Sequence, residues 1–277
     1  MNRRVASIAE AALLVLALSA GPALSLAAAD PPPAAPSDET PPLPPAPPRL
    51  ADGPDYEHCL DMLANDPTDA YAFADAWDAT GGGAPALHCR ALAQIALGDP
   101  ETGADLLEKA AAASQAPDAA RAAVLGQAVQ AWLMADDPAR GYDAASNALA
   151  LSPDNPDLLI DRSIAAATME RYIDAIDDLD RALMLDPGRV DALVFRAAAW
   201  RNESRLARAR EDVDRAVALD PDNPEALLER GIERKLAGDA AGARADWERA
   251  KALAPDTATG DLAEQNLALL AAGPASR

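Results

Sequence analysis

Two short stretches of the sequence, EHCL and LHCR, carry residue types that can do chemistry. They place His58 and Cys59 thirty residues before His88 and Cys89, and the chain holds no other cysteine or histidine. Two thiols can close a disulfide, and two thiolates with two imidazoles have the ligand types that bind Zn²⁺. Neighbouring residues on a helix point about 100° apart, so each His-Cys pair converges poorly on one metal ion. Unpaired thiols are the third alternative, and we assign no metal site.

No pattern typical of a catalytic or cofactor-binding site accompanies these residues. The sequence has no glycine-rich phosphate loop and no G-x-S-x-G, H-E-x-x-H or C-x-x-C-H motif. The run of Gly81, Gly82 and Gly83 follows no apolar strand and lacks a lysine, so it predicts a flexible turn. Two histidines leave little capacity for acid–base catalysis. We therefore expect a protein that is not an enzyme and that uses no cofactor.

The charge of the chain argues against two classes of partner. The formal net charge is −21 at pH 7 over 277 residues. Binding to a phosphate backbone or to an anionic membrane surface needs a surplus of Lys and Arg, so we expect no nucleic-acid partner. Acidity of this size keeps a protein soluble, and a basic or zwitterionic partner is the alternative interpretation.

The first residues have the pattern of an export signal. Two arginines precede an apolar run at 11–18, Pro22 ends that run, and small residues follow up to Ala29. The proline interrupts the helix before it is long enough to span a bilayer, which favours cleavage over a permanent anchor. We predict a signal peptide at 1–29, no membrane insertion after cleavage and, from the style of the signal, a bacterial periplasmic protein. The next stretch is rich in proline and predicts an extended linker at 30–50.

Export also bears on the two cysteines. In an exported chain two cysteines commonly close a disulfide, so a bridge between Cys59 and Cys89 is the favoured interpretation. Such a bridge would tie a helix predicted at 55–65 to a helix that begins near Pro85.

The prolines of the C-terminal half recur at a fixed interval. Pro153, Pro187, Pro221 and Pro255 are each 34 residues apart. A strict period in this range is typical of stacked repeats, each of which is too small to bury its own apolar face. The sequence is rich in Ala and Leu, the strongest helix formers, so each period predicts a pair of helices.

Small and large residues also recur at the same positions of each period. They are Leu159, Ser163, Ala175, Leu179, Ala182 and Pro187 in one unit, Leu193, Ala197, Trp200, Ala209, Val213, Ala216 and Pro221 in the next, and Leu227, Gly231, Ala243, Trp247, Ala250 and Pro255 in the last. This pattern resembles the tetratricopeptide repeat, with a weaker match and an insertion upstream. The resemblance implies an all-α, right-handed superhelix of stacked helix-turn-helix units, closed by a C-terminal capping helix. It divides the chain into divergent N-terminal helical repeats with a possible disulfide (51–121), four repeats (122–155, 156–189, 190–223 and 224–257) and the capping helix (258–273).

Three of these units pair an arginine in the first helix with an aspartate sixteen residues on. The pairs are Arg162 with Asp178, Arg196 with Asp212, and Arg230 with Asp246. In the unit 122–155 the same positions are Ala128 and Ala144, so both partners are lost together. Loss of one member of a partly buried ion pair strands a charge, whereas loss of both is nearly free. We therefore predict structural ion pairs that fix the register of the helices, and independent surface charges are the alternative.

The resemblance places the first helix of each unit on the concave wall of the superhelix. The partner-binding residues that it implies there are Ile160, Ile164, Val194, Ala198, Arg201, Leu228, Ile232 and Lys235. Acidic residues, among them Asp161 and Glu229, rim this mostly apolar set. Relatives that hold a peptide's C-terminal carboxylate use basic and amide side chains on this wall, and this chain lacks that set. The pattern therefore predicts an apolar or amphipathic peptide with basic flanks, and side chains buried between the helices are the alternative.

Together these patterns predict a non-enzymatic scaffold of the cell envelope that binds a protein or peptide partner. An accessory subunit or chaperone of an envelope machine for assembly or secretion is the alternative function. A metal- or redox-responsive protein that acts through the two His-Cys pairs is a further alternative.

Overall fold

The computed structural model describes residues 49–272. The predicted signal peptide (1–29) and all but the last two residues of the predicted linker (30–50) lie outside them. The helices of the described part are α2 (Pro54–Leu63), α3 (Pro67–Ala79), α4 (Gly83–Ala96), α5 (Pro100–Ala113), α6 (Asp118–Met134), α7 (Pro138–Leu151), α8 (Pro156–Thr168), α9 (Tyr172–Leu185), α10 (Val190–Asn202), α11 (Leu206–Leu219), α12 (Pro224–Leu236), α13 (Ala240–Leu253) and α14 (Ala258–Ala272). Leu50, the second of the described residues, is buried and belongs to the main hydrophobic core.

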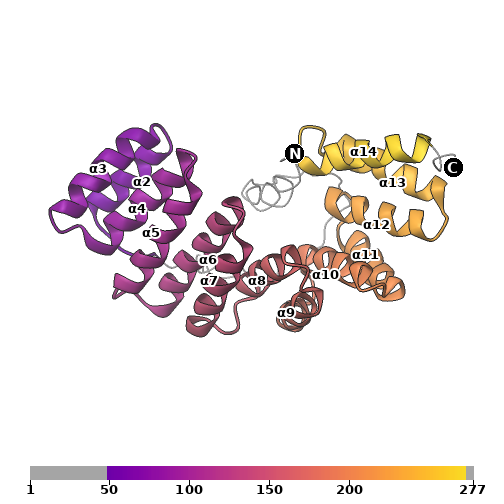
Figure 1. Ribbon diagram of the computed structural model, residues 1–277, viewed down its shortest axis with the longest axis horizontal. Helices are drawn as coiled ribbons and strands as arrows, with labels where there is room; N and C mark the ends of the chain where they lie inside the picture. Colours follow the sequence, from indigo (N-terminus) through magenta and orange to yellow (C-terminus); the bar gives the residue numbers. More distant parts are fainter. Residues whose placement is uncertain (1–48, 273–277) are drawn as a thin grey trace, which may run out of the picture.

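The helices form hairpins that stack into a curved array (Figure 1). Helices α2–α5 lie at one end of the arc, α6–α11 along its middle and α12–α14 at its other end. Each helix packs against the next one in the chain, and the first helices of successive hairpins, α8, α10 and α12, also contact one another. No strand occurs within residues 49–272. The predicted all-α solenoid of stacked hairpins is confirmed, and α14 packs on α12 and α13 as its capping helix.

The local sequence fixes where the helices begin and where the hairpins turn. Asn155 and Asn223 accept hydrogen bonds from the first backbone N–H groups of α8 and α12, and a proline follows each of them at the start of the helix. Inside each hairpin one residue has a left-handed backbone, with φ of 61° at Glu170, 59° at Ser204 and 85° at Gly238. These residues are 34 positions apart, so the same tight turn recurs in every unit.

The weaker period on the N-terminal side has a structural cause. Helix α6 is 17 residues long, whereas α8, α10 and α12 are 13 residues each. The additional residues make about one more helical turn at the start of α6, at 118–121. The insertion upstream of the unit 122–155 therefore lengthens a helix and leaves the turns on either side in place.

The core consists of small residues at the helix crossings and one large side chain beside them. Leu159, Leu193 and Leu227 occupy equivalent positions in α8, α10 and α12, and each is fully buried. Trp247 of α13 is also fully buried, and its ring lies so close to Gly231 of α12 that a Cβ atom there would collide with it. The glycine therefore makes room for the tryptophan between the two helices.

The structure contains all three arginine–aspartate pairs that the sequence indicates. In each pair the arginine Nε and Nη2 donate to the two carboxylate oxygens over 2.6–2.9 Å, and all three aspartates are buried. The Nη1 atom of Arg196 also donates to Asp180 of α9 over 2.7 Å, and Nη1 of Arg162 donates to Ser146 of α7 over 3.3 Å. These two arginines thereby connect their own hairpin to the preceding one.

We expect removal of Arg196 alone to destabilise the solenoid more than removal of the whole pair. Arg196→Ala leaves the buried Asp212 without its cation, which lowers the free energy of unfolding by roughly 3 kcal/mol, whereas the double variant with Asp212→Ala strands no buried charge. Thermal unfolding followed by circular dichroism measures the difference. Arg205→Ala is the control, because that side chain is exposed. Equal losses in the single and the double variant would contradict the joint structural role that we propose.

Candidate functional site

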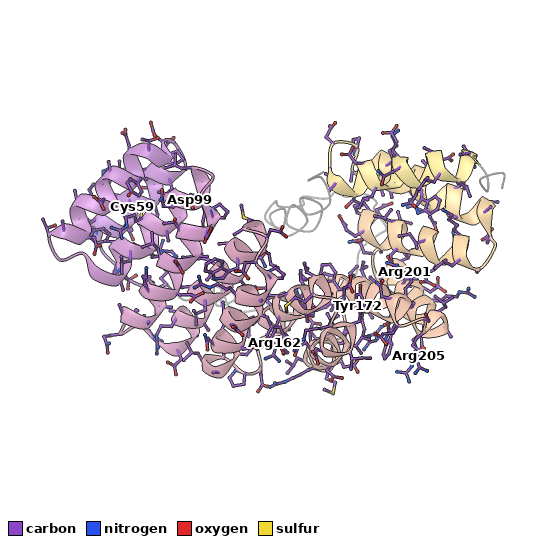
Figure 2. The ribbon with its side chains drawn as sticks, viewed as in Figure 1. Cys59, Asp99, Arg162, Tyr172, Arg201 and Arg205 are labelled. Atoms are coloured by element: carbon purple, nitrogen blue, oxygen red, sulfur yellow. A yellow bond between two sulfur atoms is a disulfide. The ribbon has the colours of Figure 1, made fainter. Side chains whose placement is uncertain are left out.

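The two cysteines are bonded to each other. Cys59 of α2 and Cys89 of α4 form a disulfide, with an S–S distance of 2.00 Å and a Cα–Cα distance of 6.3 Å. Figure 2 shows Cys59 among the first helices of the solenoid. Both cysteines are fully buried next to Ala74 of α3. The favoured disulfide is therefore present, and it ties α2, which the sequence predicted at 55–65, to α4.

The two histidines make separate contacts. His88 is buried between Tyr56, whose Oη lies 2.8 Å from Nδ1, and Gln127, whose Oε1 lies 2.7 Å from Nε2. Burial lowers the pKa of His88, and the hydrogen bond with Gln127 raises it in part. His58 is exposed, and its ring lies edge-on to Phe73. The His-Cys pairs thus do not converge on one point, and within residues 49–272 no group of three or more His, Cys, Asp or Glu side chains is arranged for a metal ion.

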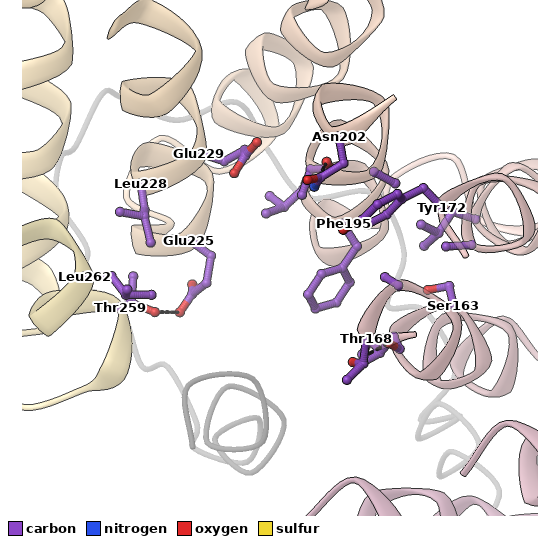
Figure 3. Close-up of a pocket in the computed structure, with 17 residues that line it drawn as sticks. Ser163, Thr168, Tyr172, Phe195, Asn202, Glu225, Leu228, Glu229, Thr259 and Leu262 are labelled. Carbon is purple, nitrogen blue, oxygen red and sulfur yellow. Dashed lines mark hydrogen bonds between the residues drawn. The ribbon is translucent and has the colours of Figure 1, made fainter. Parts of the chain in front are cut away.

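The concave side of the arc holds a pocket of about 370 Å³ (Figure 3). The first helices α8, α10 and α12 line it, and α9 and the capping helix α14 complete it. Its apolar lining includes Phe195, Leu228 and Leu262, which face the same space in Figure 3. A volume of this size lies at the lower end of the range in which proteins bind small ligands or individual side chains of a partner.

Four of the eight residues predicted on the concave wall line this pocket. They are Ile164, Val194, Ala198 and Leu228. Ile160 is 4% exposed and belongs to the core, and Ile232 is half-buried against the core. Lys235 is exposed, with its Nζ 5.7 Å from the centre of the Trp247 ring. Burial between the helices, the alternative interpretation, therefore describes Ile160 and Ile232.

Arg201, the last of the eight residues predicted on the concave wall, pairs with a buried carboxylate. Its Nε donates to Glu229 Oε1 over 2.7 Å and its Nη2 donates to Oε2 over 3.3 Å. Burial lowers the pKa of Arg201, but the hydrogen bonds and the charge of Glu229 outweigh that effect and hold the pKa above its ordinary value. Glu229, predicted on the rim, is 6% exposed and lines the pocket. A search of the sequence for opposite charges on the first helices of neighbouring repeats would have predicted this contact.

Two further glutamates of α12 flank this pair. Glu225 lines the pocket and accepts a hydrogen bond of 3.0 Å from Thr259 of α14, drawn as a dashed line in Figure 3. Glu233 is 1% exposed, and neither of its carboxylate oxygens has a hydrogen-bond partner in the described part of the chain. Burial raises the pKa of Glu233, the charge of Glu229 adds to the rise, and nearby arginines oppose it. No sequence pattern indicates that Glu233 is buried.

Another carboxylate of the predicted acidic rim lies between α6 and α8. Gln130 Nε2 donates to Asp161 Oδ1 over 2.6 Å. Burial and the charge of Asp157 raise the pKa of Asp161 to about 7, against the hydrogen bond from Gln130 and the charge of Arg189. Arg189 itself pairs with Asp157 and Asp191. The charge of this part of the rim therefore varies with pH near neutrality.

Comparison with known proteins finds solved structures that are similar to this one. No family model and no curated protein matches the sequence. A solved structure titled "Functional Characterization of Pseudomonas Aeruginosa pilF" is 17% identical with a TM-score of 0.58, and the match covers 76% of this chain and 96% of that one. MamA, residue 41 to the end, from Desulfovibrio magneticus RS-1 is 19% identical with a TM-score of 0.53, over 61% of this chain and 94% of that one. A chain of the APC/C hetero-tetramer Cut9-Hcn1 is 14% identical with a TM-score of 0.56, over 77% and 42%.

At these identities the likenesses show the fold, a solenoid of stacked helical hairpins. Each helix within residues 49–272 is too short or too polar to cross a membrane.

Proposed function

We propose that this protein, which has the tetratricopeptide-repeat fold, is a non-enzymatic scaffold of the bacterial cell envelope. It binds an apolar or amphipathic segment of a protein partner in the concave pocket between α8, α10, α12 and α14. The observation that carries the proposal is this pocket, which keeps apolar side chains accessible on the inner wall of the arc.

The pocket depends on the stacking of the hairpins. Val194 comes from α10, Leu228 from α12 and Leu262 from α14, so no single hairpin can form it. Figure 3 shows Leu228 and Leu262 on one side of the space and Phe195 on the other. A Leu or Phe side chain of a partner that fills such a space contributes roughly 2 kcal/mol by burial of apolar surface. A helical segment with apolar residues three or four positions apart would suit this wall.

The proposal that the protein works in the cell envelope rests on its N-terminal sequence and on its disulfide. The pattern of residues 1–29 is that of an export signal. A disulfide such as that between Cys59 and Cys89 persists in an oxidising compartment, and the periplasm is one. The net charge of −21 directs the search for partners toward proteins with basic surfaces.

Leu228→Asp is expected to reduce partner binding at least tenfold, because it puts a charge into the apolar part of the pocket. Leu228 is half-buried, so the helix tolerates the change better than it would at a core position. Partners crosslinked to the protein in intact cells are quantified by mass spectrometry for the wild-type and the variant chain.

The control for this experiment is Leu219→Asp, the same substitution at a position that is 51% exposed at the end of α11 and away from the pocket. Circular dichroism must show the same helix content for all three chains. If Leu228→Asp folds and keeps every native partner at the level of the control, the pocket is not the binding surface.

A further inference from the structure

Three carboxylates follow one another along one face of α12. Glu225, Glu229 and Glu233 are four residues apart, which is the spacing at which side chains of a helix are neighbours. Among residues 49–272, Arg201 is the one cation with a nitrogen within 4.0 Å of any of these carboxylates. Like charges at this spacing repel, and one guanidinium is in contact with a set of three carboxyl groups, while Arg210 acts on Glu233 from beyond contact distance. The site is therefore short of positive charge.

The lack of positive charge matters most at the buried carboxyl group of Glu233. Glu233 is 1% exposed and has no hydrogen-bond partner, which is costly for a carboxyl group in either protonation state. The Nε atom of Arg201 lies 2.7 Å from Glu229 Oε1 and 4.0 Å from Glu233 Oε1. A shift of the guanidinium by about 1 Å would bring it within hydrogen-bond distance of Glu233. Arg201 thus lies between an occupied carboxylate and an unsatisfied one.

The occupied carboxylate is the one that faces the pocket. Glu229 and Glu225 both line the pocket and point into it in Figure 3, whereas Glu233 is not part of its lining. A cation that enters the pocket can therefore reach Glu229 and Glu225 but not Glu233.

We propose that the pocket recognises a Lys or Arg side chain next to an apolar residue of the partner, and that the incoming cation takes over Glu229 while Arg201 turns to Glu233. This inference rests on the proposed function and adds the chemistry of the partner to it. The apolar lining around Leu228 holds the neighbouring residue and the aliphatic stem of the basic side chain. Both carboxylates then have a charge-assisted hydrogen bond, whereas in the free protein only Glu229 has one.

Synthetic peptides that differ in one residue test the inference. Three labelled peptides of Ala and Leu carry Arg, norleucine or Glu at the centre, and fluorescence anisotropy measures their binding to the full-length protein. The Arg peptide is expected to bind at least tenfold more tightly than the norleucine peptide, and the Glu peptide most weakly. Glu229→Gln is expected to abolish the preference for Arg. Glu233→Gln is expected to reduce that preference severalfold, because no unsatisfied carboxyl group is then relieved by binding.

Glu211→Gln, which removes the same charge at an exposed position of α11, is the control and keeps the full preference. If the wild-type chain binds all three peptides equally, or if Glu229→Gln keeps the preference, the inference is overturned and the apolar pocket stands. If no peptide binds, the proposed pocket function fails, and the inference fails with it.

Discussion

Trp247→Ala is expected to lower the free energy of unfolding by about 4 kcal/mol and to unfold the C-terminal end of the solenoid before the rest. Trp247 is fully buried, its ring packs on Gly231, and its Nε1 donates to the carbonyl oxygen of Leu228 over 3.1 Å. The truncation removes a whole indole ring from between α12 and α13. The backbones of these helices cannot close the cavity without breaking their other contacts.

The loss stays local because each hairpin of a solenoid packs mainly on its neighbours. Helix α14 packs on α12 and α13, so it loses its support with them, whereas the contacts among α8–α11 remain. Hydrogen exchange is expected to accelerate across residues 224–272 and to keep its protection at 156–219. Circular dichroism on heating should accordingly show an early, partial loss of helix.

Trp200→Ala is the matched control. Trp200 is half-buried in α10, and the guanidinium of Arg208 lies 4.6 Å from its ring centre. The same ring is deleted there from a position that buries less apolar surface, so we expect roughly half the loss of stability. Equal losses for the two tryptophans would contradict the view that the gap beside Gly231 makes Trp247 indispensable.

The Trp247 variant also tests whether partner binding depends on the folding of the helices that line the pocket. Trp247 is not part of the pocket lining, yet Leu228 of α12 and Leu262 of α14 are, and both helices depend on it. Partner binding should therefore be lost at temperatures where the C-terminal end has unfolded and the middle of the arc is still folded.

The features that repeat could be predicted from the sequence because local residues set them. The prolines at 34-residue intervals mark the hairpins, and Asn155 and Asn223 cap the helices that they precede. The pair of Arg196 and Asp212 was found because both partners lie in one repeat, at a spacing that recurs in its neighbours. Each of these features depends only on residues within a single unit.

The polar end of the pocket could not be predicted in this way. Arg201 and Glu229 belong to different hairpins, and their contact depends on how closely α10 and α12 pack. A charged residue four positions on from another is normally exposed, so the burial of Glu233 has no sequence signal. The same holds for His88, which contacts Gln127 across two hairpins. The sequence predicted which helices form the wall, and only their packing decides which side chains remain accessible.

Reduction of the disulfide is expected to lower the free energy of unfolding by about 3–4 kcal/mol, and the effect should centre on α2 and α4. The bridge between Cys59 and Cys89 spans 30 residues. The two cysteines and Ala74 are the fully buried members of a small core of their own, bordered by Leu63 and Phe73. A core of this size stabilises little, and a ten-residue helix such as α2 is marginal without tertiary support.

A chain with both Cys59→Ser and Cys89→Ser is the control for this experiment. A reductant should add two hydrogens to the mass of the wild-type chain and accelerate hydrogen exchange at 54–63. It should change neither quantity in the double variant, whose α2 already exchanges rapidly. An unchanged mass of the wild-type chain would show that the bridge does not form in the purified protein.

The contact of Tyr56 with His88 makes the effect of reduction depend on pH. Tyr56 of α2 contacts His88, and His88 contacts Gln127 of α6. Because burial lowers the pKa of His88 in the folded chain, the unfolded chain binds the proton more tightly, and stability falls as the pH drops below the ordinary histidine value of 6.5. In the reduced chain this contact is one of those that still hold α2, together with its packing on α3 and α4. Exchange at 54–63 should therefore be faster at pH 5.5 than at pH 7.5, after correction for the intrinsic exchange rate. In the oxidised chain the bridge holds α2 at both values, and equal protection of the reduced and oxidised chains at pH 5.5 would show that other contacts secure this helix.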